Sequence, residues 1–211
     1  MFGMEPVGPA LADRIDGEIY MVINPGAFVY RDSVIAYIDA PPVEKSEDMP
    51  LPEDTLRGAV TIGPERNFDQ DPRFGASVLA EIASRALSPG INDPGTAIDV
   101  IGRAVRLLAI AAEPGEPQQE VACPRVHIPP IAIGDLFDDL FTPIARDGAG
   151  VVEIGVRLQK AMLILSRLGP PDFAENAARH SRLALQRASR GLTLEHDLAV
   201  LRDLAAQLGA P

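Results

Sequence analysis

The fold is decided by one stretch of the chain, PGTAIDVIGRAVRLLAIAA, which runs from residue 94 to residue 112. It carries apolar residues on nearly every side of a helix. Its start is well marked, because Asp93 is a good N-cap and Pro94 fits the first helical position, where its missing N–H costs nothing. A helix that is apolar all round is normally buried. The stretch therefore predicts a helical bundle with this helix at its centre.

Five further segments show the spacing of three and four residues that is typical of amphipathic helices. They are residues 74–87, 133–146, 151–168, 172–190 and 193–208. Asp172 and Thr193 are predicted N-caps, and Gly191 is predicted to end the helix before Thr193.

The chain before these helices is typical of short β-strands. Residues 18–23, 28–30 and 34–38 are rich in β-formers, and turn signals at 24–26 and 31–33 separate them. Residues 39–54 are dense in proline and acid, which is typical of a linker or surface loop. Residues 121–123 and 125–128 are candidates for a further short extended pair. We expect an α+β fold, with a small three-stranded β module and acidic linker over 1–50 and a mostly α-helical bundle over 51–211.

Composition excludes several classes of protein. The 211 residues are 46% hydrophobic and carry a net charge of −11, of which residues 1–72 hold 14 acidic and 5 basic side chains. Nucleic acids and anionic membrane surfaces attract basic proteins, so neither is an expected partner. No apolar run approaches the ~18–20 residues that span a bilayer. The single cysteine, Cys123, cannot form an internal disulfide and is compatible with a reducing compartment.

The segments that come near to common enzyme motifs each lack a residue that the motif requires. Gly148-Ala149-Gly150 has Glu153 where a dinucleotide loop needs glycine. The three histidines, His127, His180 and His196, lack zinc-ligand spacing, and no serine lies in a nucleophile elbow. We expect no catalytic residue, no metal and no cofactor.

Two polar strings, residues 63–73 and 88–97, remain as candidate sites. The first string has two interpretations. In one, the carboxylates of Asp69 and Asp71 converge and bind a hard cation. In the other, Asp71 caps the helix that begins at Pro72, and Arg66 and Arg73 neutralise the charge of the loop. In the second string, backbone N–H groups at Gly95 and Thr96 form either a ligand site at a helix start or a purely structural corner. We expect the two strings to lie side by side, with Arg66 reaching the second.

The second string resembles a known family. Residues 85–94, Arg-Ala-Leu-Ser-Pro-Gly-Ile-Asn-Asp-Pro, with Thr96-Ala97, are similar to the signature of domain-of-unknown-function 2254, a bacterial family of predicted membrane proteins. Further similarities follow in the same order and spacing: Pro25-Gly26-x-Phe28-Val29, Arg66, Gln70-Asp71, Phe74-Gly75 and Glu81-Ile82-Ala83. The resemblance covers roughly residues 17–210, with departures at Asn67 and Gly95. It implies an extramembrane C-terminal portion, since family members carry N-terminal membrane helices that this chain lacks.

The function expected is a soluble, non-catalytic assembly or ligand-sensing domain of a bacterial membrane protein, on the cytoplasmic face of the inner membrane. The alternative is a divalent-metal-dependent hydrolase that uses a carboxylate cluster of Asp69, Asp71 and Asp93. Expected partners are a second copy of the chain and membrane helices of a full-length form. The basic stretch 179–190 is expected to be a solvated helix face, or to pair with the acidic first third. The candidate ligand-binding residues are Arg66, Asp69, Gln70, Asp71, Ser88, Asn92, Asp93 and Thr96.

Overall fold

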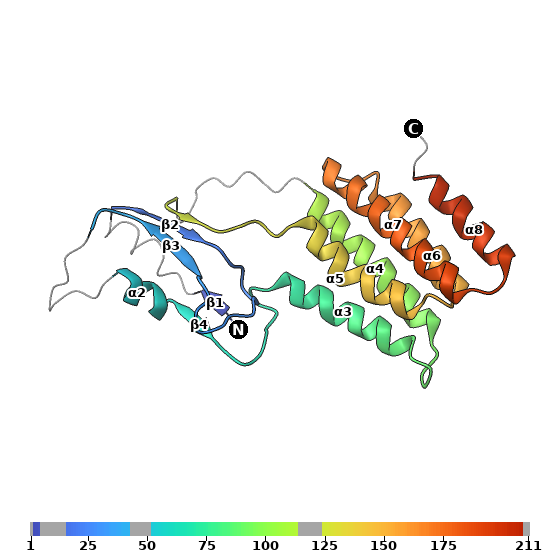
Figure 1. The fold of residues 1–211 in the computed structure, drawn as a ribbon, viewed down its shortest axis with the longest axis horizontal. Helices are drawn as coiled ribbons and strands as arrows, with labels where there is room; N and C mark the ends of the chain where they lie inside the picture. Colours follow the sequence, from blue (N-terminus) through green and yellow to red (C-terminus); the bar gives the residue numbers. More distant parts are fainter. Residues whose placement is uncertain (1, 5–15, 43–51, 114–123, 209–211) are drawn as a thin grey trace. The chain divides into compact units, whose positions relative to one another are not determined.

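The six helices expected from apolar spacing are all present in the computed structural model, which describes residues 2–4, 16–42, 52–113 and 124–208. Figure 1 labels them. They are α3 (Pro72–Ala86), α4 (Pro94–Ala112), α5 (Ile133–Asp147), α6 (Val152–Leu165), α7 (Pro171–Gly191) and α8 (Glu195–Ala206). The prediction of an α+β fold with a helical bundle is confirmed. Cys123 and the extended segment expected at 121–123 lie outside the described residues.

Of the three N-cap residues predicted from the sequence, one caps its helix in the structure. Asp93 caps α4, and its carboxylate accepts a hydrogen bond from the backbone N–H of Thr96. Asp172 does not cap α7, because Pro170 holds the cap position and Asp172 lies in the first turn. The predicted cap at Thr193 is also wrong, since Leu194 precedes the first residue of α8.

The centre of the bundle is α6, which packs against α4, α5, α7 and α8. The prediction that α4 is central is wrong. One face of α4 is open to solvent, and Leu107 on that face is 47% exposed whereas its neighbour Leu108 is 1% exposed. Ile110, one turn further on, is exposed as well. Helix α4 therefore carries more apolar side chains than its contacts with the other helices bury.

The β-strands differ from the expected set in one member. Strand β2 (Glu18–Met21) pairs antiparallel with β3 (Ala36–Asp39), and these two strands fall in the first and third of the expected segments. The third strand of this sheet is β5 (Val126–His127), which pairs parallel with β2. Residues 28–30 form no strand. They were expected as strand on local composition, but the place beside β2 is taken by a segment more than 100 residues along the chain.

A short helix and a second strand pair complete this part of the chain. Helix α2 (Pro52–Gly58) follows the segment expected as linker, and its Leu56 packs with Ile19 and Met21 on one face of the sheet. Strand β4 (Val60–Ile62) pairs antiparallel with β1 (Phe2–Met4).

The chain divides into two compact units. The β unit comprises residues 1–74 and 116–131, and the helical unit comprises 75–115 and 132–211. The described residues 52–74 and 124–131 thus belong with the strands, although they were expected in the bundle over 51–211. The physical reason is the packing of Leu56 on the sheet and the pairing of β5 with β2.

Candidate functional site

The hydrogen bonds of the first polar string centre on Asp71, whose side chain is buried, with the residue only 3% exposed. The guanidinium of Arg66 donates two hydrogen bonds to it, 2.7 Å from Nε to Oδ2 and 2.9 Å from Nη2 to Oδ1. The backbone N–H of Phe74 donates a third, at 3.0 Å to Oδ1. Asp71 is therefore the N-cap of α3, and the charge of its carboxylate is balanced by a bidentate arginine.

Gly26 lies against the same carboxylate. Its backbone φ is +84°, and a Cβ built on it would lie 1.7 Å from Oδ2 of Asp71. The turn at residues 24–26 thus packs directly on the Arg66–Asp71 pair, and only glycine fits there. The guanidinium of Arg66 also lies over the ring of Phe74, 5.3 Å from its centroid, and this ring contacts Phe68. These contacts join the two parts of the β unit that carry the family resemblance.

The second polar string is a closed connection between α3 and α4. The Asp93 carboxylate accepts two hydrogen bonds from Thr96, 3.1 Å from the backbone N–H and 2.6 Å from the hydroxyl. These bonds lower the pKa of Asp93, the hydroxyl contributing most. Ser88 donates to the carbonyl of Arg85, and its own carbonyl accepts from the N–H of Asn92, which has a positive φ of 50°.

Both strings therefore use an Asp-Pro pair in the same way. In each, an aspartate caps a helix and a proline takes the first helical position. The other candidates are exposed: the backbone N–H of Asp69 donates to the side chain of Asn67, and Gln70 lies beside Asp71 in the sequence. Within the described residues, no group of three or more His, Cys, Asp or Glu side chains could hold a metal ion. The juxtaposition of residues 66–73 with 88–96 stays a prediction.

The helical unit holds polar side chains that the sequence analysis placed at the surface. His180 and Ser181 on α7 are 3% and 2% exposed, so the expected solvated face does not include them. Ser181 and Gln159 of α6 share two hydrogen bonds. The spacing of Phe173, Ala177, Ala184 and Ala188 puts both residues on the apolar face of α7, and this signal was available in the sequence.

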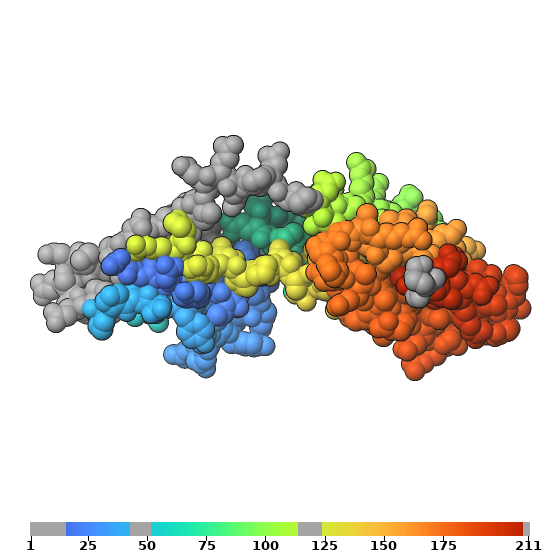
Figure 2. Space-filling model, turned by 90° about the horizontal axis from the view of Figure 1, so that it is seen from above, coloured from blue at the N-terminus to red at the C-terminus, as the bar shows by residue number. Residues whose placement is uncertain are grey.

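His180 lies among apolar side chains, and the charged groups that act on it are Asp138, Arg179 and Arg187. Its ring packs against Phe137 and Phe141, and its Nε2 lies 3.2 Å from Oδ1 of Asp138 without hydrogen-bond alignment. Burial lowers the pKa of His180 to about 4. Asp138 instead accepts from Arg179, at 2.9 Å, so this arginine of the basic stretch is paired inside its own unit. Figure 2 shows α7, in orange, at the surface of the helical unit, where Arg182 and Arg190 are exposed.

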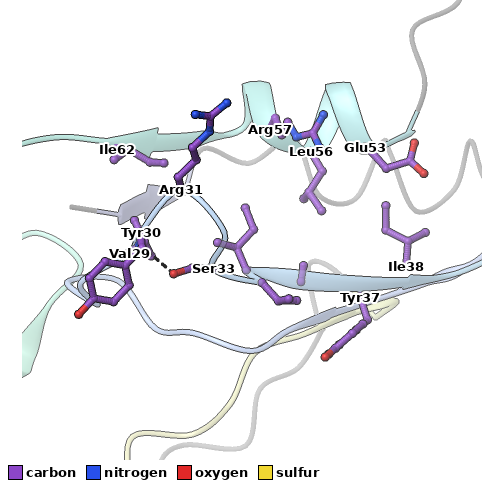
Figure 3. A pocket seen from close by; sticks show the side chains of 13 residues that line it. Val29, Tyr30, Arg31, Ser33, Tyr37, Ile38, Glu53, Leu56, Arg57 and Ile62 are labelled. Carbon is purple, nitrogen blue, oxygen red and sulfur yellow. Dashed lines mark hydrogen bonds between the residues drawn. The ribbon is translucent and has the colours of Figure 1, made fainter.

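A groove in the β unit, drawn in Figure 3, is a feature that the sequence did not indicate. Its volume is about 490 Å³, and it lies between β3 with the loop before it and α2 with β4. Apolar residues dominate its lining, among them Val34, Ile38, Leu56 and Ile62. Arg31, Arg57 and Glu53 supply the charged groups. A cavity of this size and lining is typical of ligand sites.

The other face of the β2–β3–β5 sheet carries aromatic rings in register. Tyr37, Tyr20 and His127 stand at directly opposed positions across the three strands. The Tyr20 and His127 rings stack, with centroids 4.6 Å apart, and Tyr37 is 61% exposed. Two pairs further along, on the same face, Glu18 opposes Asp39, and Glu18 contacts His127 at 2.7 Å. We call this the tyrosine face.

Comparisons with known proteins agree with the resemblance seen in the sequence. A family model described as "Predicted membrane protein (DUF2254)" matches residues 9–163. Uncharacterized proteins of Mycobacterium tuberculosis and Mycobacterium bovis are 53% identical over 51 residues, which is 24% of this chain and 10% of each relative. No solved structure matches. Among the described helices, none is long and apolar enough to cross a membrane. The match over most of the chain establishes that it belongs to the domain-of-unknown-function 2254 family of predicted membrane proteins.

Proposed function

We propose that this chain is an extramembrane assembly module of its membrane-protein family and that it has no catalytic role. The observation that carries the proposal is the use of Asp71 and Asp93 as helix caps. Asp71 is neutralised by Arg66, and Asp93 accepts two hydrogen bonds from Thr96. A catalytic carboxylate must be free to bind a cation or to exchange a proton with substrate, whereas a cap is fixed by the bonds it accepts.

The chain's exposed surfaces support assembly. Tyrosine is enriched in protein interfaces, and the tyrosine face presents Tyr20 and Tyr37 beside the carboxylates of Glu18 and Asp39. In the described part of the chain, Arg182 and Arg190 on α7 are exposed and have no ion-pair partner. Arginine binds both carboxylates and aromatic faces. A second copy of the chain therefore offers a surface that complements the tyrosine face. We place the module on the cytoplasmic side, because its single cysteine suits a reducing compartment.

Light scattering of the purified chain at low and high salt tests the proposal. We expect a dimer or higher oligomer at low salt, weakened at high salt because charged rims are screened. The double variant Arg182→Glu/Arg190→Glu should shift the chain toward monomer. The matched control is Arg103→Glu/Arg106→Glu on the exposed face of α4, which makes the same change in net charge. A strict monomer in both buffers, or an equal effect of the control, contradicts assembly through these arginines.

A further inference from the structure

We propose that the groove of the β unit binds an extended peptide that ends in a free carboxylate and adds a strand to the edge of β3. This inference builds on the proposed assembly function but concerns the edge of β3 and the groove beside it, which share Tyr37 with the tyrosine face. It names a partner other than a second copy: a peptide segment with apolar side chains at alternate positions.

The first support is the free edge of β3. The sheet order is β3-β2-β5, so β3 has a paired neighbour on one side only among the described residues. Consecutive residues from Ile35 to Ile38 all line the groove. Since successive side chains of a strand point to opposite faces, a groove that meets all four residues runs along the strand's edge. Figure 3 shows β3 forming one wall and α2 the other.

The second support is the match between this geometry and an extended backbone. An edge strand presents a row of N–H and C=O groups, and each binds best to another peptide backbone. Alkyl chains and other purely apolar ligands leave these groups unsatisfied. Alternate side chains of an added strand would point into the groove toward Leu56, Ile38 and Ile62. The partly open apolar lining includes Ile62, which is 64% exposed and gains burial when the groove is filled.

The third support is the charge at the groove. Arg31 lines it and has no ion-pair partner in the described residues. Figure 3 shows its side chain extending toward the side of the groove where Arg57 lies. Arg57 contacts Asp54 at 3.3 Å, but both side chains are mostly exposed, so this pair is weak. The two guanidinium groups outnumber the one carboxylate in the lining, Glu53, and therefore favour a carboxylate ligand, which arginine binds with two parallel hydrogen bonds.

Fluorescence anisotropy with labelled peptides tests the inference on the full chain. The probe is a hexapeptide of alternating threonine and valine with a free C-terminal carboxylate, and its control is the same peptide with a C-terminal amide. We expect the carboxylate form to bind roughly tenfold more tightly than the amide. Arg31→Glu should weaken the carboxylate form by a similar factor, while Arg103→Glu on α4 leaves it unchanged. Arg31 is exposed, so unchanged tyrosine fluorescence will show that the variant is folded.

Three outcomes would overturn the inference. The first is no anisotropy change with either peptide up to about 1 mM. The second is equal binding of the two peptides, which would remove the role of the arginines. The third is binding of decanoate without binding of the peptides, which would assign the groove to a small apolar anion. Light scattering on the same samples separates this result from the proposed function, because self-association can persist when peptide binding fails.

Discussion

Replacing Gly26 by alanine should unfold the β unit at lower denaturant than any surface substitution does. The backbone φ of +84° disfavours a residue with a Cβ, at about 1–2 kcal/mol. The new Cβ would also lie 1.7 Å from Oδ2 of Asp71. A flexible side chain could move away cheaply, but Asp71 is held by Arg66 and by the N–H of Phe74. The substitution must therefore break the ion pair, the helix cap or the turn.

The cost of losing the pair follows from its burial. Removing one partner of a fully buried ion pair costs about 3–5 kcal/mol. The side chain of Arg66 is 30% exposed, so water compensates for part of that loss. We therefore expect loss of the Arg66–Asp71 pair to lower the free energy of unfolding by about 2 kcal/mol. Together with the backbone term, we expect a loss of about 3–4 kcal/mol. The matched control is Gly58→Ala in α2, where an added Cβ meets nothing within 4 Å and should be neutral or slightly stabilising.

The chain provides a separate signal for each unit. All three tyrosines, Tyr20, Tyr30 and Tyr37, lie in the β unit, and there is no tryptophan. Tyrosine fluorescence in urea therefore follows the β unit, and far-UV circular dichroism follows mainly the helices. With typical urea dependences, the tyrosine midpoint of Gly26→Ala should fall by at least roughly 1 M. A loss below about 0.5 kcal/mol, the range of ordinary surface substitutions, would refute the close approach of the turn to Asp71.

Three further predictions concern the helical unit. Leu108→Ala should cost about 2–5 kcal/mol in urea unfolding followed by circular dichroism, whereas Leu107→Ala should cost less than about 0.5 kcal/mol; equal losses would contradict the orientation of α4. Burial lowers the pKa of His180 from 6.5 to about 4, so between pH 6.5 and pH 4 the unfolded state binds a proton that the folded state does not. The free energy of unfolding should therefore fall by up to about 1.4 kcal/mol per pH unit as the pH drops from 6.5 to 4. The variant His180→Leu should flatten this dependence, and an unchanged slope would show that other groups cause it. Asp93→Ala should cost about 1 kcal/mol through loss of the α4 cap, and a neutral result by thermal unfolding would show that the cap contributes nothing.

The helices could be predicted from sequence because their signal is local. The apolar spacing within one helix gives its existence, and the Asp-Pro pair at residues 93–94 gives a start that agrees with the structure. What a helix packs against is not local. The all-round apolar pattern of α4 suggested a central position, whereas α6, with a less continuous pattern, contacts four other helices.

The same distinction explains the β unit and its polar residues. The strand character of β2 and β3 follows from local composition, but β5 joins β2 across more than 100 residues of sequence. For each polar string the sequence left two interpretations open, a structural one and a ligand site, and the cap roles of Asp71 and Asp93 belong to the structural one. The contact of Gly26 with Asp71 had no sequence signal, since it joins segments about 45 residues apart. The groove beside β3 was missed because its walls are β3, α2 and β4, and only β3 was expected.

The central claim is that the two polar strings build structure and hold no catalytic metal. Titration of the ¹⁵N-labelled chain with Mn²⁺, followed by paramagnetic broadening of backbone amide signals, tests it most directly. Our account predicts weak, diffuse broadening over exposed acidic surfaces, with no saturable focus at Asp69, Asp71 or Asp93 and no change in Asp71→Asn. Saturable broadening centred on these three residues, and lost in Asp71→Asn, would contradict the account and favour a metal-dependent enzyme.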